Sequence, residues 1–255
     1  MDNFKSFTSY CKTSERLVLE LRSGIGGYES NLFAEQLLRM YERFSVKMSW
    51  NFKILSVNRG VNGGVREAVI EVIGKGVNTW LACEAGVHRV QRVPRTETRG
   101  RLHTSTVTLA VLPSNELNTL PKFSTNDLKI ETMKSSGAGG QHVNTTDSAV
   151  RITHMPTGIT AVSSQRSQHQ NRASAMALLK NRVCQRISAM DASNRAQARA
   201  VQIGNANRTS KIRTYNFSQD RVTDHRLKTC FKGVNRILDG EIKPIIALLV
   251  KPFIH

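Results

Sequence analysis

Two adjacent glycines followed by a glutamine are the residues of this sequence best suited to chemistry. They are Gly139, Gly140 and Gln141, within residues 136–144, which read SGAGGQHVN. Paired glycines permit backbone angles that are closed to residues with a Cβ, so the backbone can approach another molecule closely. No Lys-Ser or Lys-Thr follows them, which argues against a phosphate-binding loop. Taken alone, the stretch is equally compatible with a flexible turn.

A second candidate site is the basic, polar segment at residues 88–105, which reads HRVQRVPRTETRGRLHTS. Histidine rings that stack on bases, and hydroxyl and amide groups that bond to base edges, are typical of proteins that bind single-stranded RNA. The segment therefore favours RNA recognition. The simpler alternative is a loop that contacts phosphates only.

The charge balance also indicates a polyanionic partner. The 255 residues include 37 Lys and Arg against 19 Asp and Glu, a formal net charge of +18, and the isoelectric point is about 10.4. The basic residues spread along the whole chain, and neutralising phosphates releases condensed counterions. Nucleic acid is therefore favoured over a membrane, because we find no basic amphipathic helix and the apolar run at residues 244–250 is too short to span a bilayer.

The four cysteines are far apart in the sequence and form no Cys-x-x-Cys pair; they are Cys11, Cys83, Cys184 and Cys230. This spacing argues against a zinc site and against a disulfide framework, and it fits a reducing compartment. We therefore expect ordinary thiols and no metal.

Several motifs together resemble class I peptide release factors of the bacterial type. The glycine-rich stretch continues as TTDSAVRI up to residue 152, and it resembles the Gly-Gly-Gln loop of that family nearly residue for residue. Residues 94–96 (PRT) resemble its Pro-x-Thr codon-reading motif. Residues 213–226 (RTYNFSQDRVTDHR) and 167–171 (SQHQN) are also similar to family segments, although Ser218 replaces the usual proline and Lys211 a common acidic residue.

The resemblance implies a translation termination factor that frees the finished polypeptide from tRNA. It implies that the Gly-Gly-Gln loop enters the ribosomal peptidyl transferase centre, where the Gln141 N–H donates toward the charge that develops in ester hydrolysis. The Gln141 side chain would shape a pocket that admits water, and a glutamine methyltransferase is expected to convert Gln141 to N5-methylglutamine. His142 is not assigned as a general base, since the ribosomal RNA completes the site. The chain is therefore not expected to be a free-standing enzyme or to use a cofactor.

The resemblance also implies which residues read the stop codon, and that UAA and UAG are read rather than UGA. Thr96 would bond the first and second bases, His103 would separate the second and third, and Gln91 and Thr104 would read the third. Gly26 and Glu29, in a turn that reads GGYE, would meet the first uracil; Ser30 stands where the family usually has alanine. The full implied set is Gly26, Glu29, Gln91, Pro94, Arg95, Thr96, His103 and Thr104. The implied partners are the ribosome, an mRNA stop codon and peptidyl-tRNA, with no membrane.

The elements that must position these residues follow from hydrophobic periodicity. Alternation predicts strands that include residues 17–22, 65–73, 77–83, 107–112, 150–154 and 159–162. Apolar spacing predicts helices at residues 29–44 and 223–239, the latter ending at Gly240. A third, long helix carries a stripe predicted to be core; its members are Met176, Leu179, Val183, Ile187 and Met190. Residues 89–105 read as a basic, polar loop and strand edge, and residues 204–214 read as a polar, basic, mobile connection.

The mixture of antiparallel strands and helices predicts an α+β fold with a split arrangement. A codon-recognition superdomain at residues 14–118 and 200–255 would hold an inserted Gly-Gly-Gln domain at 122–195, with a boundary in the Pro-, Ser- and Asn-rich stretch between them. The family usually carries a helical domain of about a hundred residues before the first strand, an ordinary domain size. Residues 1–13 would be a short remnant, so we expect this chain to lack most of that domain.

Two rival functions come from other classes. A codon-independent ribosome-rescue hydrolase shares the Gly-Gly-Gln loop but lacks the Pro-x-Thr and His-Thr-Ser segments, both of which are present here. A non-catalytic ribosome-binding factor would be favoured by an altered loop, and Gly139, Gly140 and Gln141 are intact. A bacterial cytoplasm is the expected location, with a mitochondrial or plastid matrix as the alternative.

Overall fold

The structure is a computed structural model that describes residues 15–94, 97, 99–114, 124–135, 146–204 and 210–251. The chain divides into two compact units, Met1–Asn115 with Arg195–His255, and Glu116–Asn194. Both units mix strands and helices. The α+β class and the split arrangement predicted from the sequence are confirmed, and the residue limits predicted for each domain stay a prediction.

The first unit is built on an eight-stranded sheet with the order β11-β10-β9-β4-β5-β1-β3-β2. All neighbouring pairs are antiparallel except β4 and β9, which are parallel. The chain therefore builds five strands, enters the second unit, and returns to add β9 beside β4. The strands are β1 (Arg16–Ser23), β2 (Asn51–Arg59), β3 (Val65–Ile73), β4 (Gly86–Arg92), β5 (His103–Pro113), β9 (Lys211–Asn216), β10 (Arg221–Asp224) and β11 (Thr229–Lys232).

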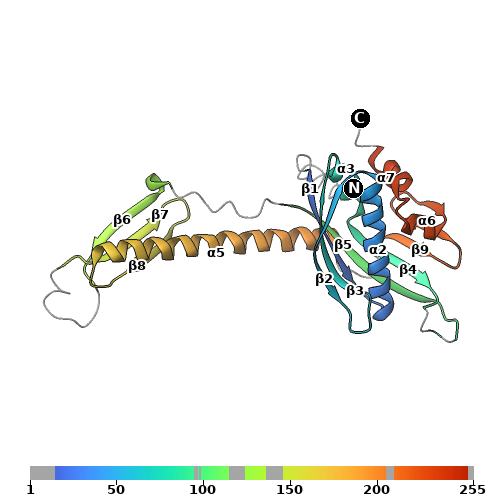
Figure 1. The fold of residues 1–255 in the computed structure, drawn as a ribbon, viewed down its shortest axis with the longest axis horizontal. Coiled ribbons are helices and arrows are strands. Elements are labelled where there is room, and N and C mark those ends of the chain that lie inside the picture. The colour runs from blue at the N-terminus through green and yellow to red at the C-terminus, as the bar shows by residue number, and fades with distance from the viewer. Residues whose placement is uncertain are drawn as a thin grey trace. The chain divides into compact units, whose positions relative to one another are not determined.

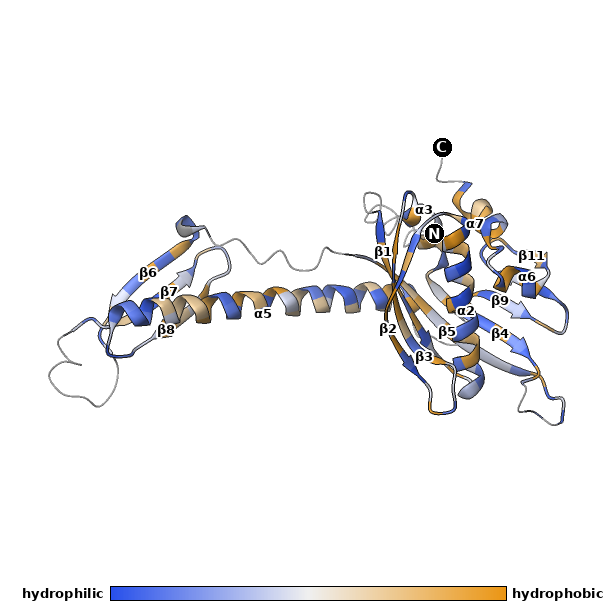
Figure 2. Ribbon diagram, in the orientation of Figure 1, coloured by the Kyte–Doolittle hydropathy of each residue, from blue (hydrophilic) through white to orange (hydrophobic). Residues whose placement is uncertain are grey.

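Helix α2 (Tyr28–Lys47) lies across one face of this sheet (Figure 1). The helical spacing predicted at residues 29–44 is confirmed, because its apolar side chains are buried against strands β1, β3 and β5. These side chains are Phe33, Leu37, Met40, Tyr41 and Phe44. The shorter helices are α3 (Val77–Leu81), η1 (Ala82–Glu84), α6 (Val234–Leu238) and α7 (Lys243–Val250), and α7 is coloured largely hydrophobic in Figure 2.

Two predicted elements of this unit are wrong. Residues 77–83 form α3 and η1 instead of a strand, because Val77 and Leu81 are one helical turn apart and both are buried. A short apolar run does not distinguish a strand from a helix. The helix predicted at residues 223–239 is replaced up to Lys232 by the hairpin of β10 and β11. Lys228 turns this hairpin with a φ of 53°, and only Val234–Leu238 is helical.

The strand edge predicted within residues 89–105 is present, and the connection predicted at residues 204–214 also contains a strand. Within residues 89–105, β4 continues to Arg92 and β5 begins at His103, and β9 begins at Lys211. Polar side chains conceal the alternation, since the buried positions of β4 and β9 include His88, Arg213 and Thr214. A hydrophobic pattern cannot show a strand whose inward-facing positions are polar.

The second unit is a three-stranded antiparallel sheet covered by the first part of a long helix. Its strands are β6 (Leu128–Met133), β7 (Ala149–His154) and β8 (Ile159–Ser163), after the short helix η2 (Thr125–Asp127). Helix α5 (Gln168–Ile203) belongs to this unit as far as Asn194. Its core is small and comprises Val150, Ile152, Ala161, Ala175, Leu179 and Val183.

The predicted core stripe of α5 is only partly confirmed. Met176, Leu179 and Val183 pack into the core, whereas Ile187 and Met190 are 38% and 55% exposed. Strands of six residues span roughly 20 Å at about 3.3 Å per residue, and the portion of α5 within this unit spans roughly 40 Å at 1.5 Å per residue. The sheet is too short to cover the whole stripe.

A fully buried ion pair joins the two chain segments of the first unit. The Arg213 guanidinium on β9 donates two hydrogen bonds of 2.7 Å to the carboxylate of Glu84 on η1, and neither side chain has any exposed area. Tyr41 on α2 donates to the same carboxylate at 3.0 Å. Burial alone would raise the pKa of Glu84, but the paired guanidinium holds it below its ordinary value.

A second carboxylate, Asp224 on β10, extends this network. Arg213 contacts it at 3.3 Å and Arg226 at 2.8 Å, and Arg226 also donates to the backbone oxygen of Cys83. Burial opposes the charge on Asp224, but Arg226 lowers the pKa of Asp224 to about 2. The hairpin of β10 and β11 is thereby tied to η1, a segment more than a hundred residues earlier in the chain.

We predict that Arg213→Met destabilises the first unit by about 3–5 kcal/mol, because it leaves the Glu84 carboxylate buried without its partner. Trp50 and Trp80 are the two tryptophans of the chain, and both lie in the first unit. Urea unfolding followed by tryptophan fluorescence therefore reports this unit alone.

The matched control is Arg236→Met, which removes a pair with Glu241 whose side chains are 77% and 45% exposed. Its expected cost is below about 1 kcal/mol. The double variant Arg213→Met with Glu84→Met should recover part of the loss, since no unpaired charge remains buried. Equal unfolding midpoints for Arg213→Met and Arg236→Met would contradict the prediction.

The stability of the first unit should depend on pH because of His88, which is fully buried on β4. Burial lowers the pKa of His88 to about 4, whereas an unfolded histidine titrates near 6.5. Between these values the unfolded chain binds the extra proton, so stability is present above about pH 6.5 and falls as the pH drops toward 4. His225, whose pKa is also lowered by burial, contributes with the same sign.

We predict that the unfolding free energy of the first unit falls by about 1–2 kcal/mol between pH 6.5 and pH 5, at about 1.4 kcal/mol per pKa unit. His88 Nε2 lies 3.0 Å from the Glu84 backbone oxygen, a contact that a glutamine amide can also make. In His88→Gln the unfolding free energy should therefore change less between pH 6.5 and pH 5. Urea midpoints followed by tryptophan fluorescence measure this change. An equally steep decline in the variant would refute the role of His88.

Candidate functional site

The turn between β1 and α2 lies against the start of β5. The Gly24 N–H donates to the Thr106 backbone oxygen at 2.8 Å, and the Thr106 N–H donates to the Ile25 oxygen at 2.9 Å. Gly26 has a φ of 137°, and a Cβ there would clash with the Ser105 side chain. The glycine is therefore required both for the backbone angle and for the close approach to β5.

Ser30, the departure noted beside this turn, is buried and makes a specific contact. Its hydroxyl lies 2.7 Å from the Gly27 oxygen and donates to it. Helix α2 has no side-chain cap at its N-terminus, so the N–H groups of its first turn donate no hydrogen bond to a capping side chain. Such an uncapped turn, which includes Glu29, suits a hydrogen-bond acceptor such as a carbonyl oxygen.

Strands β4 and β5 bring the predicted codon-reading residues together. Gln91 and Thr104 are direct cross-strand partners, and Arg92 is the partner of His103. Side chains at directly opposed positions of an antiparallel pair lie on the same face with Cβ atoms about 5 Å apart. Gln91 and Thr104 are therefore able to contact one group together, as expected of two residues that read one base.

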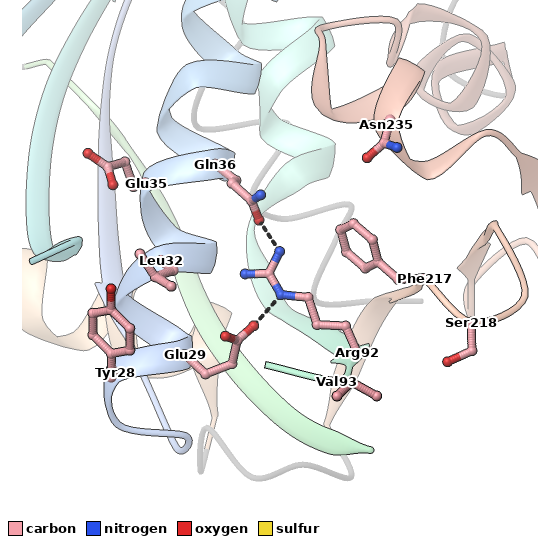
Figure 3. Close-up of a pocket in the computed structure, with 10 residues that line it drawn as sticks. All are labelled: Tyr28, Glu29, Leu32, Glu35, Gln36, Arg92, Val93, Phe217, Ser218 and Asn235. Atoms are coloured by element: carbon pink, nitrogen blue, oxygen red, sulfur yellow. Dashed lines mark hydrogen bonds and ion pairs between the residues drawn. The ribbon is translucent and has the colours of Figure 1, made fainter. Parts of the chain in front are cut away.

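Arg92 connects this strand pair to the tip of helix α2. Its guanidinium donates through Nε to the Glu29 carboxylate and through Nη1 to the Gln36 side-chain oxygen at 2.8 Å (Figure 3). The same guanidinium lies 5.1 Å from the centre of the Phe217 ring, a cation–π contact. The Glu29 side chain is thus paired and nearly buried, and it faces Arg92.

These residues line an open pocket of about 760 Å³ in the first unit. Figure 3 shows Arg92 reaching from β4 toward Glu29 and Gln36 on α2, with Phe217 beside it. Ser218, which replaces the proline usual in the resembling family, is also a lining residue. The segment at residues 213–226 therefore contributes both the buried ion network and one wall of this pocket.

The Glu97 carboxylate, which lies between β4 and β5 in the chain, contacts several described residues near it. Glu97 accepts hydrogen bonds from the Arg99 backbone N–H at 2.9 Å and from the Arg101 guanidinium at 3.0 Å. The Arg101 hydrogen bond lowers the pKa of Glu97. His103 Nε2 lies 3.0 Å from the same carboxylate, so Nε2 carries the proton because a carboxylate only accepts.

The remaining predicted site residues divide into two groups. Pro94 is buried at the end of β4, and its backbone oxygen accepts a hydrogen bond from the Glu97 N–H at 3.1 Å. Arg95, Thr96, Gly139, Gly140 and Gln141 lie outside the described residues. Of the residues predicted to read the codon, the structure therefore describes Gly26, Glu29, Gln91, Pro94, His103 and Thr104.

The Gly-Gly-Gln segment leaves β6 and enters β7 in the second unit. Met133 and Ala149 are the last paired residues of these strands, and the hydroxyls of Ser135 and Ser148 lie 3.1 Å apart. The amide of Asn171 on α5 donates to the Ser148 backbone oxygen at 2.7 Å. Both sides of the Gly-Gly-Gln segment are thus held by hydrogen bonds of described residues.

Three positioning residues, Arg92, Glu97 and Asn171, were not singled out from the sequence. Each belongs to a family-like motif, but no pattern of hydrophobicity or spacing shows which side chain it contacts. A signal for Glu97 was present, since an acidic residue flanked by Arg95, Arg99 and Arg101 is a natural ion-pair partner.

The described residues contain no group of three or more His, Cys, Asp or Glu side chains placed to hold a metal ion. Among the helices described, none is long and apolar enough to cross a bilayer.

Comparisons with known proteins agree with these motifs. A model described as the PCRF domain matches residues 9–109, and one described as the RF-1 domain matches residues 118–226. The chain is 50% identical over 232 residues to peptide chain release factor 1 of Rhizobium rhizogenes strain K84, over 91% of this chain and 64% of that relative. The chain thus spans somewhat less than two thirds of the length of this relative.

A solved structure, RF2 of Thermus thermophilus, is 31% identical with a TM-score of 0.57, over 99% of this chain and 73% of that one. The fold therefore defines a class of proteins with a split α+β body. The chain belongs to the peptide chain release factor family.

Proposed function

We propose that the protein terminates translation by reading UAA and UAG codons and by promoting hydrolysis of peptidyl-tRNA in the ribosomal peptidyl transferase centre. The observation that carries the proposal is the gathering of Gly26, Glu29, Gln91, His103 and Thr104 at one end of the central strands β1, β5 and β4, an end that we call the codon edge. Membership of the family and the net charge of +18 support a ribosomal RNA partner.

Recognition of the third codon base is the part of this proposal that the geometry supports best. Gln91 and Thr104 are directly opposed, and an amide and a hydroxyl can each donate or accept. Adenine and guanine differ at their six position by an amino group in place of a carbonyl, so this pair of side chains tolerates both bases. The exposed ring of His103, which contacts Glu97, would stack between the second and third bases.

The first codon base is proposed to meet the uncapped N-terminus of α2 at Gly26 and Glu29. Glu29 would act through its backbone, because its side chain is occupied by Arg92. The second base would be bonded by Thr96, and Pro94 with Arg95 would set the path of that segment. At this position adenine must be accepted and guanine rejected, and one unpaired buried polar group costs about 1–3 kcal/mol.

The hydrolytic role is proposed for Gly139, Gly140 and Gln141. Water attacks the ester carbonyl, the peptide leaves as a carboxylic acid, and the tRNA recovers its 3′ hydroxyl. The Gln141 N–H would donate to the oxygen that gains negative charge in this step, and the glutamine side chain would restrict access to water. The protein would act only together with the ribosome, so we do not count it as a free-standing enzyme.

The proposed partners are the decoding and peptidyl transferase centres of the ribosome, the mRNA stop codon, peptidyl-tRNA and a glutamine methyltransferase that modifies Gln141. The proposed domain limits are residues 14–118 with 200–255 for codon reading and 122–195 for hydrolysis. We propose the cytoplasm of a bacterium as the location, with an organellar matrix as the alternative.

We predict release at UAA and UAG, and release slower by at least about tenfold at UGA, since about 1.4 kcal/mol corresponds to each tenfold. The measurement is single-turnover release of a labelled peptide from ribosomes programmed with each codon and with a sense codon. Thr96→Ala should weaken release at both codons by raising the factor concentration required. Efficient release at UGA by the unmodified protein, or at the sense codon, would refute codon reading of this kind.

We predict that Gly140→Ala leaves ribosome binding largely intact but nearly abolishes release. A Cβ at a left-handed position costs roughly 1–2 kcal/mol, and loss of an oxyanion-type donor costs about 2.7–4 kcal/mol of transition-state stabilisation. Release at saturating factor should therefore fall by at least about a hundredfold. A binding assay is the control, and normal release by the variant would exclude this role for the loop.

A further inference from the structure

Asn171, near the start of helix α5, uses every hydrogen-bonding position of its side-chain amide. Its nitrogen donates to the backbone oxygens of Ser148 and Gln165, at 2.7 Å each. Its oxygen accepts from the Ser163 hydroxyl at 3.0 Å and from the Gln165 N–H at 2.6 Å. The residue has no exposed area, so water replaces none of these bonds.

This side chain joins three segments that meet where the Gly-Gly-Gln segment enters the sheet. Ser148 precedes β7, Ser163 ends β8, and Gln165 lies in the turn that leads to α5. Gln168, one turn earlier on the helix, adds a bond of 3.2 Å to the Asp147 backbone oxygen. The Ser148 N–H in turn donates to the Thr146 oxygen at 2.9 Å.

The contacts of Asn171 are separate from the apolar core of the second unit. That core is held by side chains farther along β7 and α5, such as Ile152, Leu179 and Val183. Asn171 instead bonds the backbone oxygen of Ser148, three residues after the segment 136–145. Aspartate has nearly the same shape but no N–H, so it would direct a carboxylate at two backbone oxygens.

We propose that Asn171 is a positioning residue for the Gly-Gly-Gln loop, setting the backbone on which Gln141 is carried toward the ester. This inference rests on the proposed hydrolytic function. It assigns no contact with the substrate to Asn171. Its effect is expected on the chemical step rather than on codon reading or ribosome binding, because the codon edge lies in the other unit.

The test compares Asn171→Asp with the unmodified chain on UAA-programmed ribosomes at saturating factor. We expect release to fall by at least about tenfold, as for a displaced transition-state donor, and the half-saturating factor concentration to change by less than about twofold. Ser163→Ala is the matched control, because it removes one bond to the same amide but leaves the link to Ser148. Its release rate should stay within about threefold of the unmodified chain.

A second readout separates positioning from simple loss of folded protein. A loosened loop should admit hydroxylamine in place of water, so the hydroxamate share of the product should rise by about fivefold or more in Asn171→Asp. A lower folded fraction reduces both products equally. Circular dichroism at 222 nm reports total helix content, to which α5 contributes as the longest helix described, and tryptophan fluorescence reports the first unit as a control.

Each outcome decides the inference. Release within about twofold of the unmodified chain, an equal loss of binding and release, or an unchanged product ratio overturns it. If the unmodified chain releases no peptide at any stop codon, the proposed function fails and the inference fails with it. If the unmodified chain releases and the variant matches it, only the role of Asn171 is lost.

Discussion

The buried pair of Arg213 and Glu84 is the interaction on which the first unit depends. The second unit is inserted in the middle of the first, so the sheet has to be completed by strands that return after a long excursion. Backbone pairing of β4 with β9 joins these segments, and the two bonds of the guanidinium to the carboxylate fix their register. A charged donor with a planar fork satisfies one partner orientation, whereas apolar side chains tolerate several. Burying such a pair costs desolvation energy. We infer that its role here is to select one pairing of the two chain segments over others.

The geometry of the candidate codon edge depends on the pairing of β4 with β9. Gln91 lies on β4, the strand that β9 joins, and its backbone oxygen accepts a hydrogen bond of 3.0 Å from the Phe217 N–H. Phe217 follows β9 directly and packs against Arg92, which holds Glu29 at the tip of α2. A shift of β9 along β4 would therefore move the ring that supports Arg92. The pairing of β4 with β9 therefore supports both the stability of the first unit and the geometry of the candidate codon edge.

Much of the fold could be predicted from the sequence, and the failures have a common physical cause. Strands β1, β3 and β7 and helix α2 alternate or repeat cleanly because one face of each is apolar. Strand β9 was missed because Arg213 occupies an inward-facing position, and arginine is rarely buried without a partner that lies far away in sequence. The hairpin of β10 and β11 was taken for a helix because Leu227 and Phe231 are four residues apart, a spacing that helices share.

The candidate site was likewise predicted only in part. Its residues were identified by motif, since the order of side chains in a loop is a local property. Their contacts depend on strand register, which a sequence does not specify at a distance. The cross-strand pairing of Gln91 with Thr104 and the four bonds of Asn171 became visible only in three dimensions. The exposed end of the stripe on α5 is a related failure, because it depends on where the neighbouring sheet ends.

Under the proposed function, the acidic residues at the codon edge would lie beside RNA, although the protein as a whole is strongly basic. An unpaired carboxylate would repel phosphates and would lose solvation as RNA approached. Glu29 and Glu97 avoid this because Arg92 and Arg101 neutralise them within the protein. The pair of Arg92 and Glu29 holds the tip of α2. The pair of Arg101 and Glu97 holds the carboxylate that contacts the His103 ring. In the proposed function, specific recognition at this edge would therefore depend on charges that cancel one another, while the excess positive charge elsewhere on the chain would supply affinity without sequence preference.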